Sequence, residues 1–422
     1  MKLLAHSRLV RMFSLGFIIQ ALSSGANFAV GLILIRRTND LQYSYYVLVS
    51  NGLLLLAALQ NAFIQPFTVT RLTRLAAPEQ RTLIGNLMWT RRRWVPVLCI
   101  CALSATAACR ALHLLDTAGA VLIAASLLTA AATLGREFLR MVLFAHHRPR
   151  EVLSGDAIYA AAMIVGVMAA TFGRQPALLA IMTLGIAAVL GTMVLRQGLW
   201  RVEPWNLDAR RDLILQLFAA GTWSMSGAGI HWLLIQGYSY LIAGTLNLRD
   251  VAAVAASRLT LMPVFVLSGG VSILLFPITS RWLRDIGVHE TIRRLALITA
   301  ALGAAALCYM ATMWIGRDWI FGTILKKHIA HRDGLLLLWS VVFLVTLCRD
   351  QLATLLASRE RFRSMTITTC ISAGIWLVSS SLAIREFGAP GAVAGILVGE
   401  LTNLVGIVLM IFMETRPRAA AT

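Results

Sequence analysis

Long apolar segments constrain the fold of this chain more than any other feature of its sequence. Hydrophobic residues make up 58% of its 422 positions, and the mean hydropathy is +0.76. A helix of about 20 apolar residues crosses the hydrocarbon of a bilayer, where the backbone must satisfy its own hydrogen bonds. The sequence therefore predicts an all-α polytopic membrane protein with about 12 transmembrane helices. The segments lie near 12–35, 41–65, 94–109, 117–145, 154–172, 176–195, 214–245, 251–277, 295–316, 334–357, 364–384 and 389–413.

The basic residues between these segments predict the orientation. If both termini lie on one side, that side carries 24 of the 38 Lys and Arg residues, Arg416 and Arg418 included, and the opposite side carries 10. Because cytoplasmic loops are enriched in Lys and Arg, we expect both termini in the cytoplasm. The net charge of +19 is spread over short loops. It therefore follows the membrane pattern and does not indicate a nucleic-acid partner.

Two basic-acidic doublets, Arg136-Glu137 and Arg349-Asp350, lie inside apolar segments and are 213 residues apart. A charge at that depth costs about 2.5–3.5 kcal/mol, so such residues usually face a cavity. Three further features align at offsets of 210–215 residues: Asn39-Asp40 with Arg249-Asp250, Gln65-Pro66 with Phe276-Pro277 at the expected end of each second helix, and Phe172-Gly173 with Phe387-Gly388. Two parallel six-helix repeats around a central cavity are predicted: an N-lobe (1–196), a linker (197–212) and a C-lobe (213–422).

Four arginines and four carboxylates lie within the segments: Arg136, Arg140, Arg258, Arg349, Glu137, Asp156, Asp350 and Glu400. Glu137 can reach Arg140 three residues on, and Asp156 is a candidate partner for either Arg136 or Arg140. Helical spacing offers Arg136, Arg349 and Arg258 no partner in their own helices. We expect Arg136 and Arg349 in particular to face a substrate. For Glu400, near mid-membrane, a salt bridge to an arginine and ion coupling both remain open; Asp156 is a second coupling candidate.

Polar side chains also share helix faces in the first segment of each half. Gln20, Ser24 and Asn27 follow helical spacing in the first half, as do Trp232, Gln236 and Tyr240 in the second. They are candidates for a cavity wall and for sugar contact, because aromatic faces stack on sugar rings while amides and hydroxyls bond to hydroxyl groups. Helix packing and anchoring at the membrane interface are the alternatives.

The arginines suggest the chemistry of a ligand. Guanidinium stays charged when desolvated and binds phosphate through two parallel hydrogen bonds. With the aromatic residues, this predicts a lipid diphosphate that carries a glycan, bound by Arg136, Arg349, Arg258 and Arg140. We expect no metal and no cofactor. A multidrug or cation antiporter, a major-facilitator transporter and a membrane polysaccharide polymerase are the alternatives, but the chain has no nucleophile–base motif and its longest outer loop, Arg317 to Asp333, is short.

Two stretches carry a family resemblance, QALSSGANFAVGLILIRRTND (Gln20 to Asp40) and REFLRMVLFAHHRPREVLSGD (Arg136 to Asp156). With the twelve-helix plan, they resemble the Wzx-type oligosaccharide flippases of the multidrug/oligosaccharidyl-lipid/polysaccharide flippase superfamily. The resemblance implies transfer of undecaprenyl-diphosphate-linked oligosaccharide across a bacterial inner membrane for surface or exported polysaccharide. The implied partners are that lipid, the phospholipid bilayer and other polysaccharide-assembly proteins.

Overall fold

The computed structural model describes residues 2–72, 75–202, 204–327, 329–359 and 361–415, which contain helices and no strand. Eleven of the described helices are long and apolar enough to cross a membrane. The predicted all-α polytopic fold is therefore confirmed, while Arg416 and Arg418 lie outside the described residues. The elements are α1 (Lys2–Arg37), α2 (Asp40–Leu72), α3 (Ala77–Ala111), α4 (Thr117–Ala145), α5 (Pro149–Ala170), α6 (Pro176–Val202), α7 (Ile214–Gln236), α8 (Tyr238–Thr245), α9 (Leu248–Asp285), α10 (Gly287–Ile315), α11 (Arg317–Trp319), the π-helix η1 (Ile320–Leu325), α12 (Arg332–Ser358), α13 (Phe362–Phe387) and α14 (Ala389–Thr415).

The predicted segment 214–245 is divided into α7 and α8 at Gly237. At this position a Cβ atom would lie 2.8 Å from the ring of Trp376 and also against the carbonyl oxygen of Leu233. Only glycine therefore allows α13 to pack this closely against the junction between the two helices.

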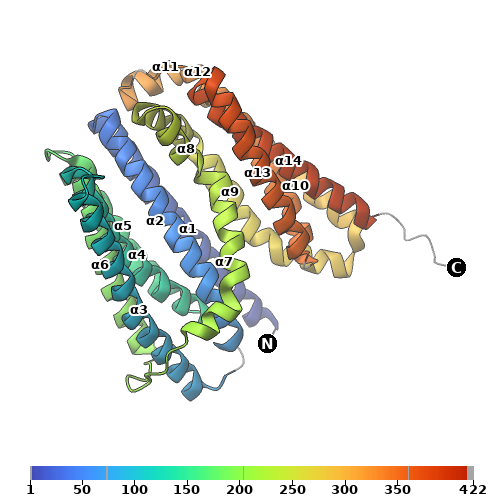
Figure 1. Ribbon diagram of the computed structural model, residues 1–422. Coiled ribbons are helices and arrows are strands. Elements are labelled where there is room, and N and C mark those ends of the chain that lie inside the picture. Colours follow the sequence, from blue (N-terminus) through green and yellow to red (C-terminus); the bar gives the residue numbers. More distant parts are fainter. Residues whose placement is uncertain (1, 73–74, 203, 328, 360, 416–422) are drawn as a thin grey trace. The chain divides into compact units, whose positions relative to one another are not determined.

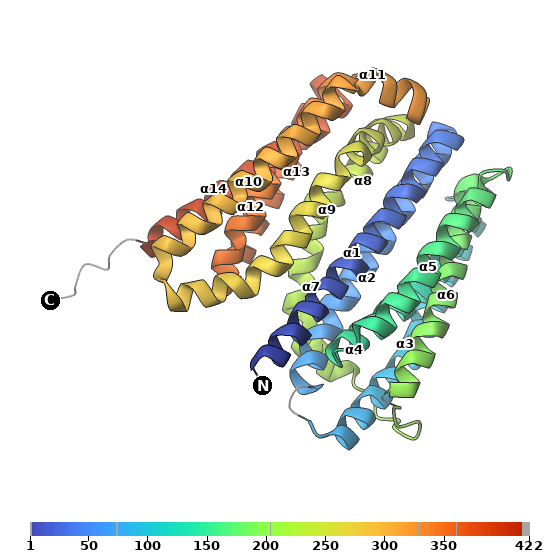
Figure 2. The same cartoon turned by 180° about the vertical axis from the view of Figure 1, so that it is seen from behind.

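The chain forms two compact units, Met1–Gly229 (the N-terminal unit) and Ile230–Thr422 (the C-terminal unit). In the N-terminal unit α5 packs on α6, α4 on α6, α2 on α4 and α3 on α4. In the C-terminal unit α13 packs on α14, α12 on α14, α9 on α12 and α10 on α12 (Figures 1 and 2). These four pairs join corresponding helices of the two units, as expected for six-helix repeats. The division itself falls within α7, and the lobe limits at 197–212 stay a prediction.

Two of the aligned sequence features have a different structural meaning from the one expected. Neither second helix ends at its proline, because α2 continues through Pro66 to Leu72 and α9 continues through Pro277 to Asp285. Proline within membrane helices is tolerated when neighbouring groups satisfy the freed backbone. The proline alignment thus marks positions inside two long helices.

The true match at the start of the second helices is Asn39 with Asn247. The Oδ1 atom of Asn39 accepts a hydrogen bond from Gln42 N at 2.8 Å, and that of Asn247 accepts one from Asp250 N at 3.0 Å. Asparagine at this position satisfies an N–H group that has no partner within the helix. The alignment of Asn39-Asp40 with Arg249-Asp250 is therefore wrong by two residues.

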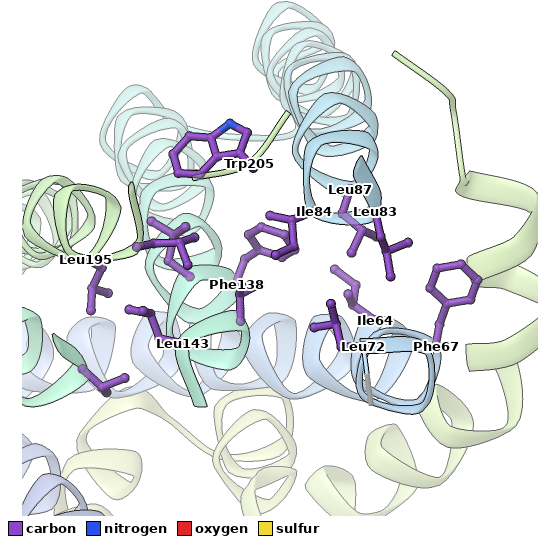
Figure 3. Packing of buried hydrophobic residues seen from close by; sticks show 14 of the residues in the cluster. Ile64, Phe67, Leu72, Leu83, Ile84, Leu87, Phe138, Leu143, Leu195 and Trp205 are labelled. Atoms are coloured by element: carbon purple, nitrogen blue, oxygen red, sulfur yellow. The ribbon is translucent and has the colours of Figure 1, made fainter. Parts of the chain in front are cut away.

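The linker between α6 and α7 lies against α3. Its first part, up to Val202, belongs to α6, and the following residues contact one face of α3. Arg211 N donates to Asn86 Oδ1 at 2.8 Å, and Leu213 N donates to Thr90 Oγ1 at 3.0 Å. Trp205 is buried among apolar residues of α3, α4 and α6, such as Ile84 (Figure 3). The linker is thus part of the core of the N-terminal unit.

Asp212 is the last residue of the linker and lies just before α7, which starts at Ile214. Its carboxylate accepts hydrogen bonds from Ile214 N at 3.0 Å and from Trp94 Nε1 at 2.9 Å, and it pairs with Arg93 at 3.5 Å. Partial burial raises the pKa of Asp212, but the hydrogen bonds from Ile214 and Trp94 and the charge of Arg93 outweigh it and leave the pKa below its ordinary value. Asp212 therefore stabilises this junction as a carboxylate.

Gly85 permits the close approach of the linker to α3. A Cβ atom there would lie 2.9 Å from Ala209 Cβ and would also strike the carbonyl oxygen of Asn206. We expect Gly85→Ala to destabilise the protein by about 1–3 kcal/mol, because the linker backbone must move. Thermal unfolding in detergent measures this, with Gly303→Ala as the control, since a Cβ at Gly303 meets nothing within 4 Å. Equal unfolding midpoints for the two variants would contradict the packing of the linker.

Candidate functional site: the buried charges

In the N-terminal unit, α4 and α5 hold a neutral cluster of four charges. Arg136 is 4% exposed and Asp156 is 1% exposed, and they are joined by an ion pair of 2.6 Å. Arg136 also contacts Glu137 at 2.8 Å. Arg140 pairs with Glu137 at 2.9 Å and with Asp156 at 3.0 Å. The predicted pairs of Arg140 with Glu137 and of Asp156 with the arginines are confirmed, and each arginine meets two carboxylates.

The guanidinium of Arg136 also lies over an aromatic ring. Its Cζ atom is 3.7 Å from the ring centroid of Tyr159, on α5. Tyr159 follows Asp156 by three residues, so one face of α5 supplies both an anion and a π-face. Tyr159 was not among the residues predicted from the sequence. Its position three residues after Asp156, on the same helix face, could have identified it.

In the C-terminal unit, one arginine meets two carboxylates. Arg349 on α12 contacts its neighbour Asp350 at 2.7 Å and forms a buried ion pair with Glu400 on α14. The side chains of Arg349 and Glu400 are 4% and 2% exposed. Of the two interpretations of Glu400, a salt bridge and ion coupling, the structure shows the salt bridge.

The expectation that Arg136 and Arg349 have no partner within their own helices is wrong for both residues. Helical spacing considers residues three or four apart, but each guanidinium reaches the carboxylate of the very next residue, Glu137 or Asp350. The other partners, Asp156 and Glu400, come from different helices at separations of 20 and 51 residues. Periodicity within one helix carries no information on such contacts.

Arg258 on α9 differs from the other three buried arginines. Its Nη1 atom donates to Gln236 Oε1 at 2.8 Å, and its Cζ lies 5.5 Å and 5.7 Å from the ring centroids of Trp339 and Tyr238. Its side chain is 9% exposed, and no carboxylate of the described residues lies within ion-pair distance. Its Nε atom has no hydrogen-bond acceptor among these residues. Arg258 is thus a buried cation held by an amide and two rings.

A small pocket lies beside Arg258. It is lined by Arg258, Trp339 and Glu400, with the apolar residues Ile235, Phe265, Val342, Phe343 and Ile396 and the hydroxyl of Thr346. It has room for about one water molecule. One cation without a carboxylate partner and one carboxylate that belongs to the Arg349 cluster therefore face the same space. Trp339, which lies in an apolar run, is the second residue that sequence analysis missed.

The proposed cavity-wall residues lie on α1 in the N-terminal unit and on α7 and α8 in the C-terminal unit. Gln20 Nε2 donates to Ser24 Oγ at 3.3 Å, and both Gln20 and Asn27 are exposed. In the C-terminal unit the rings of Trp232 and Tyr240 are 5.6 Å apart, across the junction of α7 and α8. Gln236, between them in sequence, accepts the hydrogen bond from Arg258. The Trp232, Gln236 and Tyr240 set is therefore continuous with the site around Arg258.

No group of three or more His, Cys, Asp or Glu side chains arranged to hold a metal ion occurs in the described part of the chain. The acidic residues of the two clusters are each engaged by arginine. Arg258 presents its guanidinium to a pocket with room for about one water molecule, and the paired arginines can bind another group only by exchanging a carboxylate partner.

Comparison with known proteins identifies the fold. No family model and no curated protein sequence matches the chain. A solved multidrug resistance MATE family transporter of the MOP superfamily, in an inward-facing conformation, is similar with a TM-score of 0.76 and 12% identity, over 94% of this chain and 96% of that one. The lipid II flippase MurJ is similar with a TM-score of 0.69 and 8% identity, over 96% and 87%. The eukaryotic MATE transporter AtDTX14 is similar with a TM-score of 0.63 and 15% identity, over 96% and 95%.

The chain therefore has the fold of these multidrug transporters and of this lipid flippase. The likeness is one of fold alone. At 8–15% identity it does not extend to substrate or mechanism.

Proposed function

We propose that the chain is a flippase that moves an undecaprenyl-diphosphate-linked oligosaccharide from the cytoplasmic to the periplasmic leaflet by alternating access. The observation that carries this proposal is Arg258, a buried cation without a carboxylate partner among the described residues, beside the rings of Tyr238 and Trp339. Desolvated guanidinium binds phosphate in a bidentate manner. Aromatic rings beside it suit a sugar close to the diphosphate.

The paired arginines enter the same proposal in a different role. Arg136, Arg140 and Arg349 are already neutralised by carboxylates. For any of them to bind diphosphate, the phosphate must replace a carboxylate. Substrate binding would then break an ion pair between two helices. A ligand that breaks such a pair binds one conformation better than the other and so shifts the conformational equilibrium.

The multidrug or cation antiporter is the second candidate. It is favoured by the excess of acid at the Arg349 cluster, where two carboxylates share one arginine, since an excess acid suits a cationic substrate. The similar MATE structure is named as a multidrug resistance transporter, which raises this alternative by analogy of fold.

Reconstitution distinguishes the two candidates. The purified chain in liposomes should move a fluorescent prenyl-diphosphate oligosaccharide between leaflets, and a matched prenyl monophosphate more slowly, because fewer phosphate oxygens reach the arginines. Drug-cation efflux from the same liposomes serves as the comparison. Movement of drug cations without movement of the diphosphate lipid would favour the antiporter and overturn the flippase proposal.

The proposed setting is a bacterial inner membrane with both termini in the cytoplasm. There the protein would supply lipid-linked units to other polysaccharide-assembly proteins. Accessibility of single cysteines introduced at Arg81 and at Arg317 to a membrane-impermeant reagent tests the orientation, because we expect these positions on opposite sides.

Glu400 is the proposed ion-coupling residue, with Asp156 as the second candidate. We expect Glu400→Gln to remove the dependence of transport on an imposed pH gradient, because the side chain can no longer exchange a proton. Arg349 keeps Asp350 as a partner in this variant, so the folded protein should persist. The measurement is the transport rate in liposomes with and without the gradient. Asp285→Asn, on the end of α9, is the matched control, and an unchanged gradient response in Glu400→Gln would exclude the coupling role.

A further inference from the structure

The linker forms a second candidate binding site, away from the buried charges. A pocket, here called the linker pocket, is lined by Pro78, Arg81, Thr82, Pro204, Trp205 and Asn206. It lies between the first turns of α3 and the linker, within the N-terminal unit. We propose that the linker pocket binds the phosphate head group of an anionic glycerophospholipid of the surrounding leaflet.

The linker pocket is built on fixed backbone. Asn206 N donates to the carbonyl oxygen of Arg81 at 3.1 Å, which joins the two walls directly. Trp205 is 5% exposed, so one edge of its ring closes the pocket while the rest belongs to the core. The pocket residues Arg81, Thr82 and Asn206 are exposed. Thr82 Oγ1 donates to the carbonyl oxygen of Pro78 at 3.1 Å and Asn206 Oδ1 accepts from Asp208 N at 2.9 Å, which orients both side chains. A preformed site of this kind loses little conformational entropy when it binds a ligand.

Aromatic and basic side chains extend the pocket toward the membrane. The rings of Trp200 and Trp205 meet edge to face at 4.8 Å, and the guanidinium of Arg196 lies 5.8 Å from the Trp205 ring. Trp200 is 43% exposed. Tryptophan is enriched at the level of lipid head groups, where its amphipathic ring is stable. The pair therefore suits the interface region of a bilayer.

The length of the neighbouring helix α5 indicates the depth of the linker pocket relative to the hydrocarbon core of the membrane. It has 22 residues, so by its rise it spans about 33 Å, just enough for a hydrocarbon core of about 30 Å. The first turn of α5 thus marks one edge of the hydrocarbon. A Cβ on Gly198 would lie 3.2 Å from Glu151 Cβ in that turn, so Trp200 and the linker follow immediately outside this edge.

Charge complementarity selects an anionic lipid. The linker and the helix segments that lead to it expose Arg81, Arg92, Arg93, Arg196, Arg201, Arg210 and Arg211. The carboxylates of the same segments in the sequence are Glu79, Glu203, Asp208 and Asp212, fewer than the arginines, and Asp212 already pairs with Arg93. Basic pockets at the cytoplasmic edge of membrane helices bind anionic head groups. The general enrichment of arginine in such loops explains the charge, but it does not explain a preformed pocket with a tryptophan wall.

The test is lipid retention by the full chain. Protein purified in mild detergent and analysed by native mass spectrometry should keep added phosphatidylglycerol in preference to phosphatidylcholine. We expect the double variant Arg81→Gln/Arg196→Gln to weaken phosphatidylglycerol binding roughly twenty-five-fold, since each basic residue near a lipid surface contributes roughly fivefold. Arg281→Gln/Arg284→Gln is the matched control, with the same loss of two exposed charges on the end of α9.

Each outcome decides the proposal. Loss of phosphatidylglycerol in the pocket variant alone supports it. Equal loss in both double variants would show a non-specific effect of charge and overturn it. Inorganic phosphate is the third arm: if phosphate alone displaces phosphatidylglycerol at millimolar concentration, the pocket binds a free anion and the lipid assignment is wrong.

Discussion

Arg349→Ala is expected to destabilise the protein by about 3 kcal/mol or more, because breaking a buried pair leaves an uncompensated charge behind. In this variant both Asp350 and Glu400 lose the arginine that they share. Thermal unfolding in detergent and the yield of folded protein measure the effect. The expected loss exceeds that of Arg136→Ala, because Arg140 still pairs with Glu137 and Asp156 when Arg136 is removed.

The control is the double variant Arg349→Ala/Glu400→Gln. Removing one of the stranded carboxylates should restore part of the lost stability, and the double-mutant cycle gives the coupling between the two positions. If Arg349→Ala and Arg136→Ala unfold at the same temperature, the difference between the two clusters has no energetic meaning. Because Arg349→Ala is expected to destabilise the protein, a loss of transport in this variant indicates substrate contact only if the folded protein is shown to persist.

Arg258→Ala is expected to reduce flipping of the diphosphate lipid by about tenfold to a hundredfold, with a smaller loss of stability than Arg349→Ala. A hydrogen bond to a charged group contributes about 1.5–3 kcal/mol, and no ion pair with a described carboxylate is broken by the change. Flipping rates in liposomes, normalised to folded protein, measure the effect. Arg258→Lys should remain well below the native rate, because an ammonium group cannot form the bidentate contact.

Arg249→Ala provides the control for Arg258, because Arg249 is an exposed arginine near the start of the same helix, α9. It should flip the lipid at the native rate. If Arg258→Ala also flips at the native rate while it remains folded, Arg258 does not contact the substrate. The flippase proposal would then lose the observation that carries it.

The sequence was sufficient for the fold because membrane insertion imposes local rules. Apolar length predicts a helix without knowledge of its neighbours, and most of the predicted segments correspond to helices that can span a membrane. The doublets Arg136-Glu137 and Arg349-Asp350 were likewise correctly matched between the halves. In both, the arginine pairs with the carboxylate that follows it, so the repeat is visible in the chemistry as well as in the spacing.

The sequence was insufficient for the site because charge balance depends on contacts between helices. Asp156 and Glu400 reach Arg136 and Arg349 from other helices, which removes the two arginines expected to be free. In the sequence, Arg258 was one of four candidates, and Arg136 and Arg349 were preferred to it. Only its environment of an amide and two rings separates it from the rest.

What the sequence by itself determined is the all-α membrane fold and its internal repeat, because hydrocarbon thickness and backbone hydrogen bonding act along the chain. What only the tertiary structure decided is which buried cation lacks a carboxylate partner among the described residues, and that the linker is a packed part of the N-terminal unit. Both depend on side chains distant in sequence, such as Gln236 near Arg258 and Asn86 against the backbone of Arg211. Which group neutralises a charge or contacts a loop depends on distances between different helices, and the periodicity of one helix carries no information on those distances.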